Sequence, residues 1–239
     1  INQRIKLRNW HIMTSEKQLL DYIKQFNLDE FFSSALISEL KVERLPKGAL
    51  LSSLGEPLEK FYMLVEGKLK IYALQENGKK ILIRFYRPFA AVGDLEFLSD
   101  YKPNALVETQ EPSTVLSISM ASIRKSAYDC PKFLRFVVRE LSRKMFAYSR
   151  ACQMNLVYPL ENRIASYLWS ICTITDGKQL EEIRVTSLNE MADLLCTSYR
   201  HLSRVLTQME DRNILSRNRG KIKITDHDQL NDLAVGLFE

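Results

Sequence analysis

Between residues 42 and 119 the chain consists of short apolar runs separated by turns, and this pattern restricts the fold more than any other feature. The runs cover residues 61–65, 69–74, 81–85 and 115–118. Five of the eight glycines lie at the breaks, at positions 48, 55, 67, 78 and 93. The pair Asn77-Gly78, between KIYALQE and KKILIRF, is the strongest short signal for a β-hairpin. Many short strands with such turns predict an antiparallel β-barrel or jelly roll rather than a parallel sheet.

Helical periodicity replaces the strand pattern on both sides of this section. Residues 15–42 read as helical, and Pro131 favours the first turn of a second, longer helix that ends before Pro159. Such a helix can pack back on the barrel or form a parallel coiled coil with a second copy, and its charged outer flank favours the coiled coil. That flank contains Arg135, Arg139, Arg143, Lys144 and Arg150. The predicted dimer interface consists of Leu134, Val137, Leu141, Met145, Tyr148 and Cys152.

Composition and cysteine spacing narrow the class of protein. A chain of 239 residues with 46% hydrophobic and 26% charged residues is expected to fold and not to be disordered. No apolar run approaches the ~18 residues of a membrane span, and INQRIKLRNWHIM lacks the apolar core of a signal peptide. Cys130, Cys152, Cys172 and Cys196 form no CxxC pair, so neither a metal site nor a disulfide framework is expected. The sequence therefore predicts a cytoplasmic protein without membrane contact.

Positive charge is concentrated near the carboxyl terminus. The window from Thr197 to Ile224 holds seven basic and two acidic residues, so it accounts for the whole formal net charge of +5. A solvated basic face is the plain alternative for a single charge run. Concentration in one window is nevertheless typical of a nucleic-acid-binding surface.

The residues from position 186 onward follow the order helix, break, helix, hairpin. Thr186 is the predicted N-cap of the first helix. Cys196 lies in the break, where glycine is the commonest residue, and Ser198 caps a recognition helix over residues 198–209. The apolar residues Leu202, Val205, Leu206 and Met209 share one face of that helix. ILSRNRGKIKI then predicts a basic wing with Gly220 in its turn.

The opposite face of the recognition helix is expected to read bases in the major groove. Arginine forms a bidentate pair with the two acceptors of guanine, while other cations and hydroxyls meet phosphates and carry no sequence information. The predicted groove-facing residues are Tyr199, Arg200, Ser203 and Arg204. The predicted phosphate contacts are Thr186, Ser198, Arg217, Arg219 and Lys221, and His201 can belong to either set.

These segments together resemble the Crp/Fnr superfamily of transcription regulators over nearly the whole chain. The stretch GEPLEKFYMLVEGKLKIYALQENGKKILIRFYRPFAAVGDLEFL resembles the family's cyclic-nucleotide-binding-type barrel. ENRIASYL resembles the start of its DNA-binding domain, and TSYRHLSRVLTQMEDRNIL resembles its recognition helix, with Arg204 at the base-contacting arginine. Within the superfamily, the pattern SYRHL followed by VL is most similar to the YeiL-like branch.

The resemblance implies an α+β fold in three parts. Residues 14–120 are expected to form a β-barrel or jelly-roll (double-stranded β-helix) sensor domain, and residues 121–158 a long dimerisation helix. Residues 159–239 are expected to form a winged helix-turn-helix domain. The implied function is a dimeric, sequence-specific regulator that binds near-palindromic double-stranded DNA and contacts RNA polymerase.

The effector motifs depart from those of the cyclic-AMP-binding relatives. Those relatives carry Gly-Glu-Leu for the ribose and Arg-Ser for the cyclic phosphate; this chain has Gly93-Asp94-Leu95 and Asn104-Ala105. A buried phosphate without its arginine lacks a counter-charge, so cyclic AMP is not expected to bind. Ser149 matches a residue that touches the base in relatives, and Tyr148 beside it is bulky enough to fill the pocket. No cofactor is expected, although an effector of unknown identity stays open.

Three other functions are less consistent with the sequence. A cyclic-nucleotide-dependent activator is the nearest alternative. A cupin-like metalloenzyme needs histidines inside the barrel, whereas His11, His201 and His227 lie outside it, so neither an enzyme nor a metal site is predicted. A pure protein-interaction module leaves the basic helix and wing unexplained. An iron–sulfur centre formed by an N-terminal cysteine cluster is not expected, since the first cysteine is Cys130.

Overall fold

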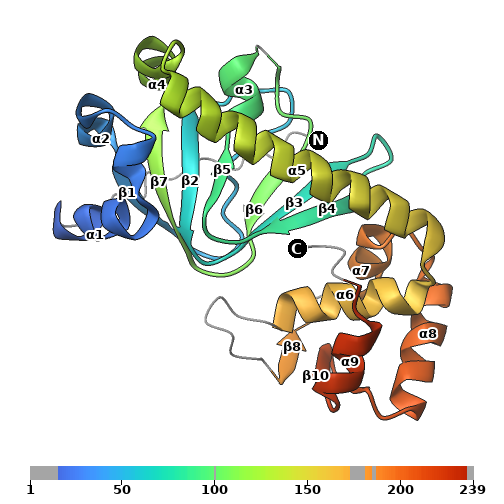
Figure 1. Ribbon diagram of the computed structural model, residues 1–239. Helices are drawn as coiled ribbons and strands as arrows, with labels where there is room; N and C mark the ends of the chain where they lie inside the picture. Colours follow the sequence, from blue (N-terminus) through green and yellow to red (C-terminus); the bar gives the residue numbers. More distant parts are fainter. Residues whose placement is uncertain (1–15, 100, 173–180, 185–186, 236–239) are drawn as a thin grey trace.

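The computed structural model describes residues 16–99, 101–172, 181–184 and 187–235, with the backbone alone at positions 16, 150–156 and 184. An N-terminal barrel is followed by a long connecting helix and a C-terminal domain of helices with a small sheet (Figure 1). The predicted α+β architecture is therefore confirmed.

The barrel consists of two antiparallel sheets, one with the strand order β1-β7-β2-β5 and the other with the order β4-β3-β6. The strands are β1 (Lys41–Leu45), β2 (Lys60–Glu66), β3 (Leu69–Leu74), β4 (Lys80–Tyr86), β5 (Ala90–Val92), β6 (Leu106–Thr109) and β7 (Ser113–Ser119). The predicted hairpin at Asn77-Gly78 joins β3 to β4. Gly78 has φ +80°, a backbone conformation that glycine adopts without steric cost, and the Asn77 side chain accepts a hydrogen bond from the Lys79 backbone at 3.0 Å.

Short helices flank the strands of the barrel (Figure 1). They are α1 (Glu16–Phe26), η1 (Leu28–Glu30), α2 (Ser34–Glu39), α3 (Asp94–Leu98) and α4 (Met120–Ala127). The section predicted to be helical over residues 15–42 is broken at Asn27, where φ is +49°, and starts again at Ser33, whose hydroxyl caps α2. Leu28, Phe32 and Leu36 from this section are buried in the barrel core.

The long helix α5 (Pro131–Val157) starts at the proline that the sequence indicates. The segment predicted as one helix over residues 121–158 is therefore two helices, because α4 ends at Ala127. The first half of α5 lies across the barrel (Figure 1). The Phe133 ring is inserted there, with its centroid 5.2 Å from that of Phe32, 5.7 Å from that of Phe61 and 5.1 Å from that of Phe97.

The predicted dimer interface needs one correction on this helix. Val137 is fully buried against the barrel, so this part of α5 does pack back on its own domain. Val138 is 57% exposed and takes the place of Val137 in the outward stripe. Leu134, Val138, Leu141, Met145 and Tyr148 alternate at four- and three-residue intervals, which is the heptad spacing of a coiled-coil seam. Leu134 and Leu141 are partly buried against the barrel core, whereas Val138, Met145 and Tyr148 are exposed. The side chain of Cys152 lies outside the described part.

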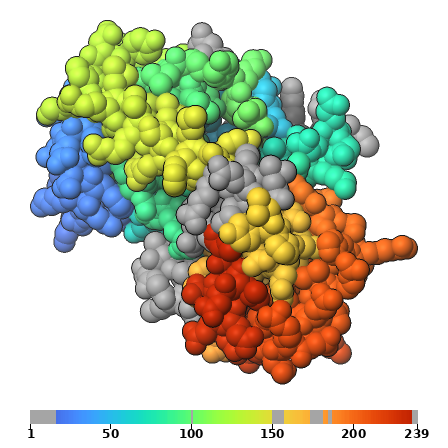
Figure 2. Space-filling view, turned by 45° about the vertical axis from the view of Figure 1, so that its right-hand side comes forward, coloured from blue at the N-terminus to red at the C-terminus, as the bar shows by residue number. Residues whose placement is uncertain are grey.

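The C-terminal domain has its own buried core. Its elements are α6 (Leu160–Cys172), β8 (Glu182–Arg184), α7 (Leu188–Leu194), α8 (Tyr199–Asp211), β9 (Leu215–Asn218), β10 (Lys221–Ile224) and α9 (His227–Leu233). The three strands form an antiparallel sheet in the order β8-β10-β9. In the space-filling view this domain is a lobe, coloured orange to red, beneath the barrel domain (Figure 2). Within the described residues, no helix has both the length and the apolar character that a membrane span requires.

Candidate nucleic-acid interface

Two helices, α7 and α8, form the helix-turn-helix unit at the predicted place. The N-cap of α7 is Ser187, whose hydroxyl accepts a hydrogen bond from the Glu190 backbone at 3.2 Å. The predicted cap, Thr186, is therefore one residue too early, and Thr186 itself lies outside the described residues. Thr186 and Ser187 offer the same capping chemistry, so the local sequence does not show which of them caps the helix.

The turn between the two helices has the backbone conformation that its position requires. Cys196 has φ +50°, a left-handed conformation that explains why glycine is common there. Cys196 is exposed, and partial desolvation by its surroundings raises the pKa of its thiol. The hydroxyl of Ser198 accepts a hydrogen bond from the backbone of His201 at 3.2 Å and so caps α8, as predicted.

An apolar stripe anchors α8 to the rest of the domain. Leu202, Leu206 and Met209 are fully buried and Val205 is 7% exposed. They belong to one cluster with residues of α6 and α7, which include Leu168 and Met191. This packing fixes the rotation of α8 about its axis, so it also fixes which residues face solvent.

The opposite face of α8 carries the predicted base-reading residues. Arg200, His201 and Arg204 are exposed, Tyr199 is 49% exposed, and Ser203 is half-buried. Within the described part of the chain, neither the Arg200 nor the Arg204 guanidinium has an ionic or hydrogen-bonding partner. Two unpaired guanidinium groups, four residues apart on an anchored helix, are available to an external acceptor.

The wing is a hairpin whose turn consists of Arg219 and Gly220. Both residues have positive φ, +41° and +80°, as a two-residue type I′ turn requires. Arg219 is exposed at the tip. Lys223 is also exposed, although it was not among the predicted contacts. The alternation of buried Ile222 and Ile224 with this lysine was the signal that could have identified it.

Two predicted wing contacts are committed to partners within the chain. Arg217 donates to the Glu210 carboxylate from Nε at 2.7 Å and from Nη2 at 2.5 Å, and to the Thr207 hydroxyl at 2.8 Å. Lys221 forms an ion pair with Glu182 at 2.5 Å. Arg217 therefore ties the wing to α8 and is not a free charge at the tip.

The same contact shifts the protonation of Glu210. Hydrogen bonds from the Arg217 side chain and backbone hold the pKa of the Glu210 carboxyl below its ordinary value, because they favour the charged form. The contact therefore contributes stability above the unfolded pKa of about 4.3, and this contribution is lost as the pH falls through the lowered folded value.

Replacing Glu210 with Gln tests this contribution. We expect Glu210→Gln to lower the free energy of unfolding near pH 7, and the difference from the parent to shrink below about pH 4. Urea unfolding at a series of pH values measures the difference. The control is Asp211→Asn, which removes an exposed neighbouring carboxylate without this contact. A Glu210→Gln difference that is independent of pH would contradict the assignment.

At the predicted effector position, Asp94 is already paired within the chain. Asp94 is 3% exposed, and its two oxygens accept hydrogen bonds from Lys144 Nζ on α5 at 2.7 and 2.8 Å. The same ammonium donates to the Ala91 carbonyl at 2.8 Å and lies 4.9 Å from the Tyr86 ring centroid. Lys144 was predicted on the outward charged flank of α5, which is wrong. Its seven-residue spacing from buried Val137 was the signal for an inward direction.

The other predicted effector residues do not converge on Asp94. Gly93 adjoins it as the N-cap of α3 with φ +103°, but Leu95 is 51% exposed and Asn104 is exposed. Ala105 is partly buried, and its carbonyl accepts from Ser52 at 3.1 Å. On α5, Tyr148 is 58% exposed and Ser149 is exposed, so Tyr148 does not fill the barrel as predicted.

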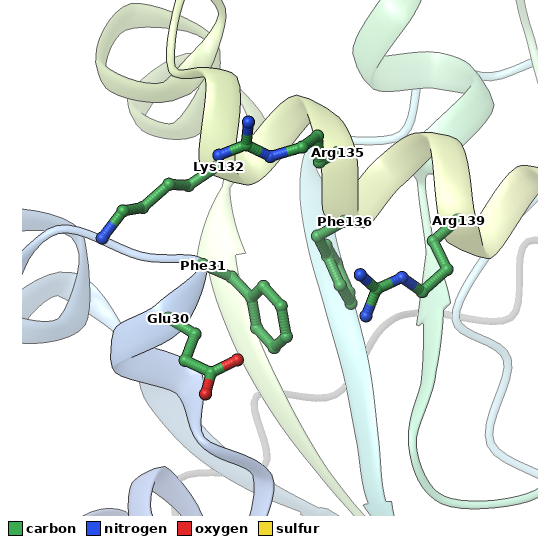
Figure 3. A pocket seen from close by; sticks show the side chains of 6 residues that line it. All are labelled: Glu30, Phe31, Lys132, Arg135, Phe136 and Arg139. Atoms are coloured by element: carbon green, nitrogen blue, oxygen red, sulfur yellow. The ribbon is translucent and has the colours of Figure 1, made fainter.

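A shallow hollow of about 280 Å³ lies elsewhere, between η1 and α5 (Figure 3). Its lining consists of Glu30, Phe31, Lys132, Arg135, Phe136 and Arg139. None of the predicted effector residues lines it. Among the described residues, no group of three or more histidine, cysteine or acidic side chains is placed to hold a metal ion.

Comparisons with known proteins agree with this geometry. The family model of the cyclic nucleotide-binding domain matches residues 42–127, and the family model of the Crp-like helix-turn-helix domain matches residues 162–233. The regulatory protein YeiL of Escherichia coli O157:H7 is 29% identical over 182 residues, which are 76% of this chain and 80% of that protein. The probable transcriptional regulator flp of Lacticaseibacillus casei is 24% identical over 208 residues, 87% of this chain and 94% of that protein.

A solved structure supports the same fold. A transcriptional regulator of the Crp/Fnr family from Eubacterium rectale superposes with a TM-score of 0.76 over 89% of this chain and 98% of that chain, at 16% identity. A sensor barrel joined by a long helix to a helix-turn-helix domain defines a class of transcription regulators, not of enzymes. The chain belongs to the Crp/Fnr family of DNA-binding transcription regulators.

Proposed function

We propose that this regulator binds near-palindromic double-stranded DNA as a homodimer and reads bases with Arg200 and Arg204. The observation that carries the proposal is the exposure of both guanidinium groups on a helix whose other face is buried in the domain core. Arginine is the commonest reader of guanine in the major groove. Arg219 and Lys223 on the wing, together with the Ser198 hydroxyl, are suited to phosphate contacts that set the register.

Pairing of two α5 helices is the dimer contact that we propose. Val138, Met145, Phe146 and Tyr148 are 57%, 76%, 72% and 58% exposed, and a run of large exposed apolar residues on one helix marks an interaction surface. A two-fold axis along the helix pair would place two copies of α8 on half-sites about one turn of DNA apart. Such a regulator acts in the cytoplasm and contacts RNA polymerase at its promoters.

The barrel, in this proposal, does not bind cyclic AMP. The acidic residue expected at the ribose position is satisfied by Lys144, and a ligand would have to break that buried pair. The arginine that binds the cyclic phosphate in cyclic-AMP-binding relatives is replaced here by Asn104. Dependence on a cyclic nucleotide is the alternative, and an effector of other chemistry remains compatible with the fold.

Removing one base-reading arginine tests the proposed interface. Arg204→Ala should weaken binding to a palindromic duplex selected from a random library by about 1–3 kcal/mol per half-site, and binding to random duplex far less. Fluorescence anisotropy at fixed salt measures both. The control is Arg212→Ala at the C-cap of α8, since Arg212 is already paired with Glu161. Equal losses on both duplexes would contradict base reading.

A charge placed in the exposed stripe of α5 tests the dimer. Met145→Glu should weaken self-association at least about tenfold, because two like charges would meet in the seam. Sedimentation equilibrium at micromolar concentration measures the change. Lys132→Glu, on another face of α5, should leave the dimer intact. A parent protein that is already monomeric would contradict the proposal.

Ligand addition tests the effector assignment. About 1 mM cyclic AMP should leave the melting temperature and the DNA affinity unchanged, whereas a ligand with a Kd near 10 μM would stabilise the fold by about 2.7 kcal/mol. Differential scanning fluorimetry with and without the nucleotide is sufficient. A rise of several degrees would favour the alternative of a cyclic-nucleotide-dependent activator.

A further inference from the structure

The core of the DNA-binding domain continues into the sensor barrel. Tyr72, Leu82 and Phe85 of the β3–β4 hairpin belong to the same buried cluster as Leu168 of α6 and Met191 of α7. The ring centroids of Phe85 and of Tyr167 on α6 are 6.2 Å apart. The two domains are therefore joined by packed side chains as well as by α5.

A buried cation adds a polar contact to this junction. Lys68, which precedes β3, is 1% exposed, and its ammonium donates to the backbone carbonyl of Ser170 on α6. The ammonium also lies 5.8 Å from the Phe85 ring centroid. Burial of an ammonium is costly unless hydrogen bonds compensate for the lost water, and the Ser170 carbonyl supplies one such bond from the other domain.

Two ion pairs connect the tip of the same hairpin to α7. Lys79 lies 3.4 Å from Asp193, and Lys80 lies 3.3 Å from Glu190. The Lys80 ammonium is also 5.2 Å from the Tyr72 ring centroid, so it bridges the hairpin and the helix. In Figure 1, α7 lies between the barrel and α8. A contact that holds α7 therefore also sets the direction in which α8 faces.

We infer that the β3–β4 hairpin clamps α7 and that Lys79 and Lys80 are positioning residues for DNA binding. They hold the recognition helix in a fixed direction without touching DNA. This inference rests on the proposed function. A domain that is free to rotate must be ordered when it binds, and that cost lowers affinity for a site that requires two helices at a set distance. Because both pairs are partly exposed, the effect is modest, about three- to tenfold in affinity.

Charge reversal with rescue separates the clamp from bulk electrostatics. Lys79→Glu with Lys80→Glu places like charges opposite α7, and adding Asp193→Lys with Glu190→Lys restores both pairs in the reverse sense. The matched control is Lys47→Glu with Lys102→Glu, which makes the same change in net charge at exposed barrel lysines. A fourth variant carries only Asp193→Lys and Glu190→Lys, which adds positive charge while it breaks the clamp.

Two measurements are made on each full-length variant. The first is titration of the palindromic duplex selected by the parent and of random duplex. The second is small-angle X-ray scattering without DNA, which reports the spread of the domains. We expect the variants with broken pairs to lose about three- to tenfold in the ratio of palindromic to random affinity and to have a larger radius of gyration. The rescued variant should recover both values.

Four results would overturn the inference. The first two are parent-like values in the Lys79→Glu, Lys80→Glu variant and an equal loss in the Lys47→Glu, Lys102→Glu control. The third is no recovery in the rescued variant. The fourth is a raised ratio of palindromic to random affinity in the Asp193→Lys, Glu190→Lys variant, which would show that bulk charge causes the effect. If the parent binds no duplex even at low salt, the proposed function fails, and the scattering comparison alone still decides whether the hairpin clamps α7.

Discussion

Burial of one apolar stripe on α8 is the constraint on which the proposed DNA-binding surface depends. Leu202, Leu206 and Met209 lose all their exposed surface, and burial of each such side chain is worth about 1.5–3 kcal/mol. A helix fixed on one face has no freedom to rotate, so Arg200 and Arg204 stay in solvent. Their mutual repulsion is small beside this packing energy. The packing, not the charge, therefore decides where the guanidinium groups lie.

The sensor domain reaches that helix by two separate routes. Along the first, α5 is held to the barrel by the Phe133 ring and by the buried pair of Lys144 with Asp94. Along the second, the β3–β4 hairpin packs directly on α6 and α7. A change in the barrel would alter the direction of α8 only if it moved both contacts or released one of them. The pair of Asp94 with Lys144 closes the contact between α5 and the barrel at this position.

Turn residues and helical periodicity predicted the elements whose structure depends on residues close together in the sequence. The Asn77-Gly78 hairpin, the start of α5 at Pro131 and the stripe on α8 follow from turn propensities and from helical period. The errors concern partners brought by other elements. The wing sequence alone predicts Arg217 at DNA, but its partner Glu210 is on α8. The helical pattern alone predicts Lys144 on the outer flank, but its partner Asp94 is on the barrel. The shift from Val137 to Val138 has the same origin, since two adjacent valines fit the period almost equally.

Methylation interference on the selected duplex tests the central claim most directly, because it reports which groove the anchored arginines enter. Methyl groups at guanine N7 lie in the major groove, where an arginine pair needs both guanine acceptors. The account predicts two clusters of interfering guanines about one helical turn apart, both lost in Arg204→Ala. Interference confined to adenine N3 in the minor groove, or none at guanine N7, would contradict it.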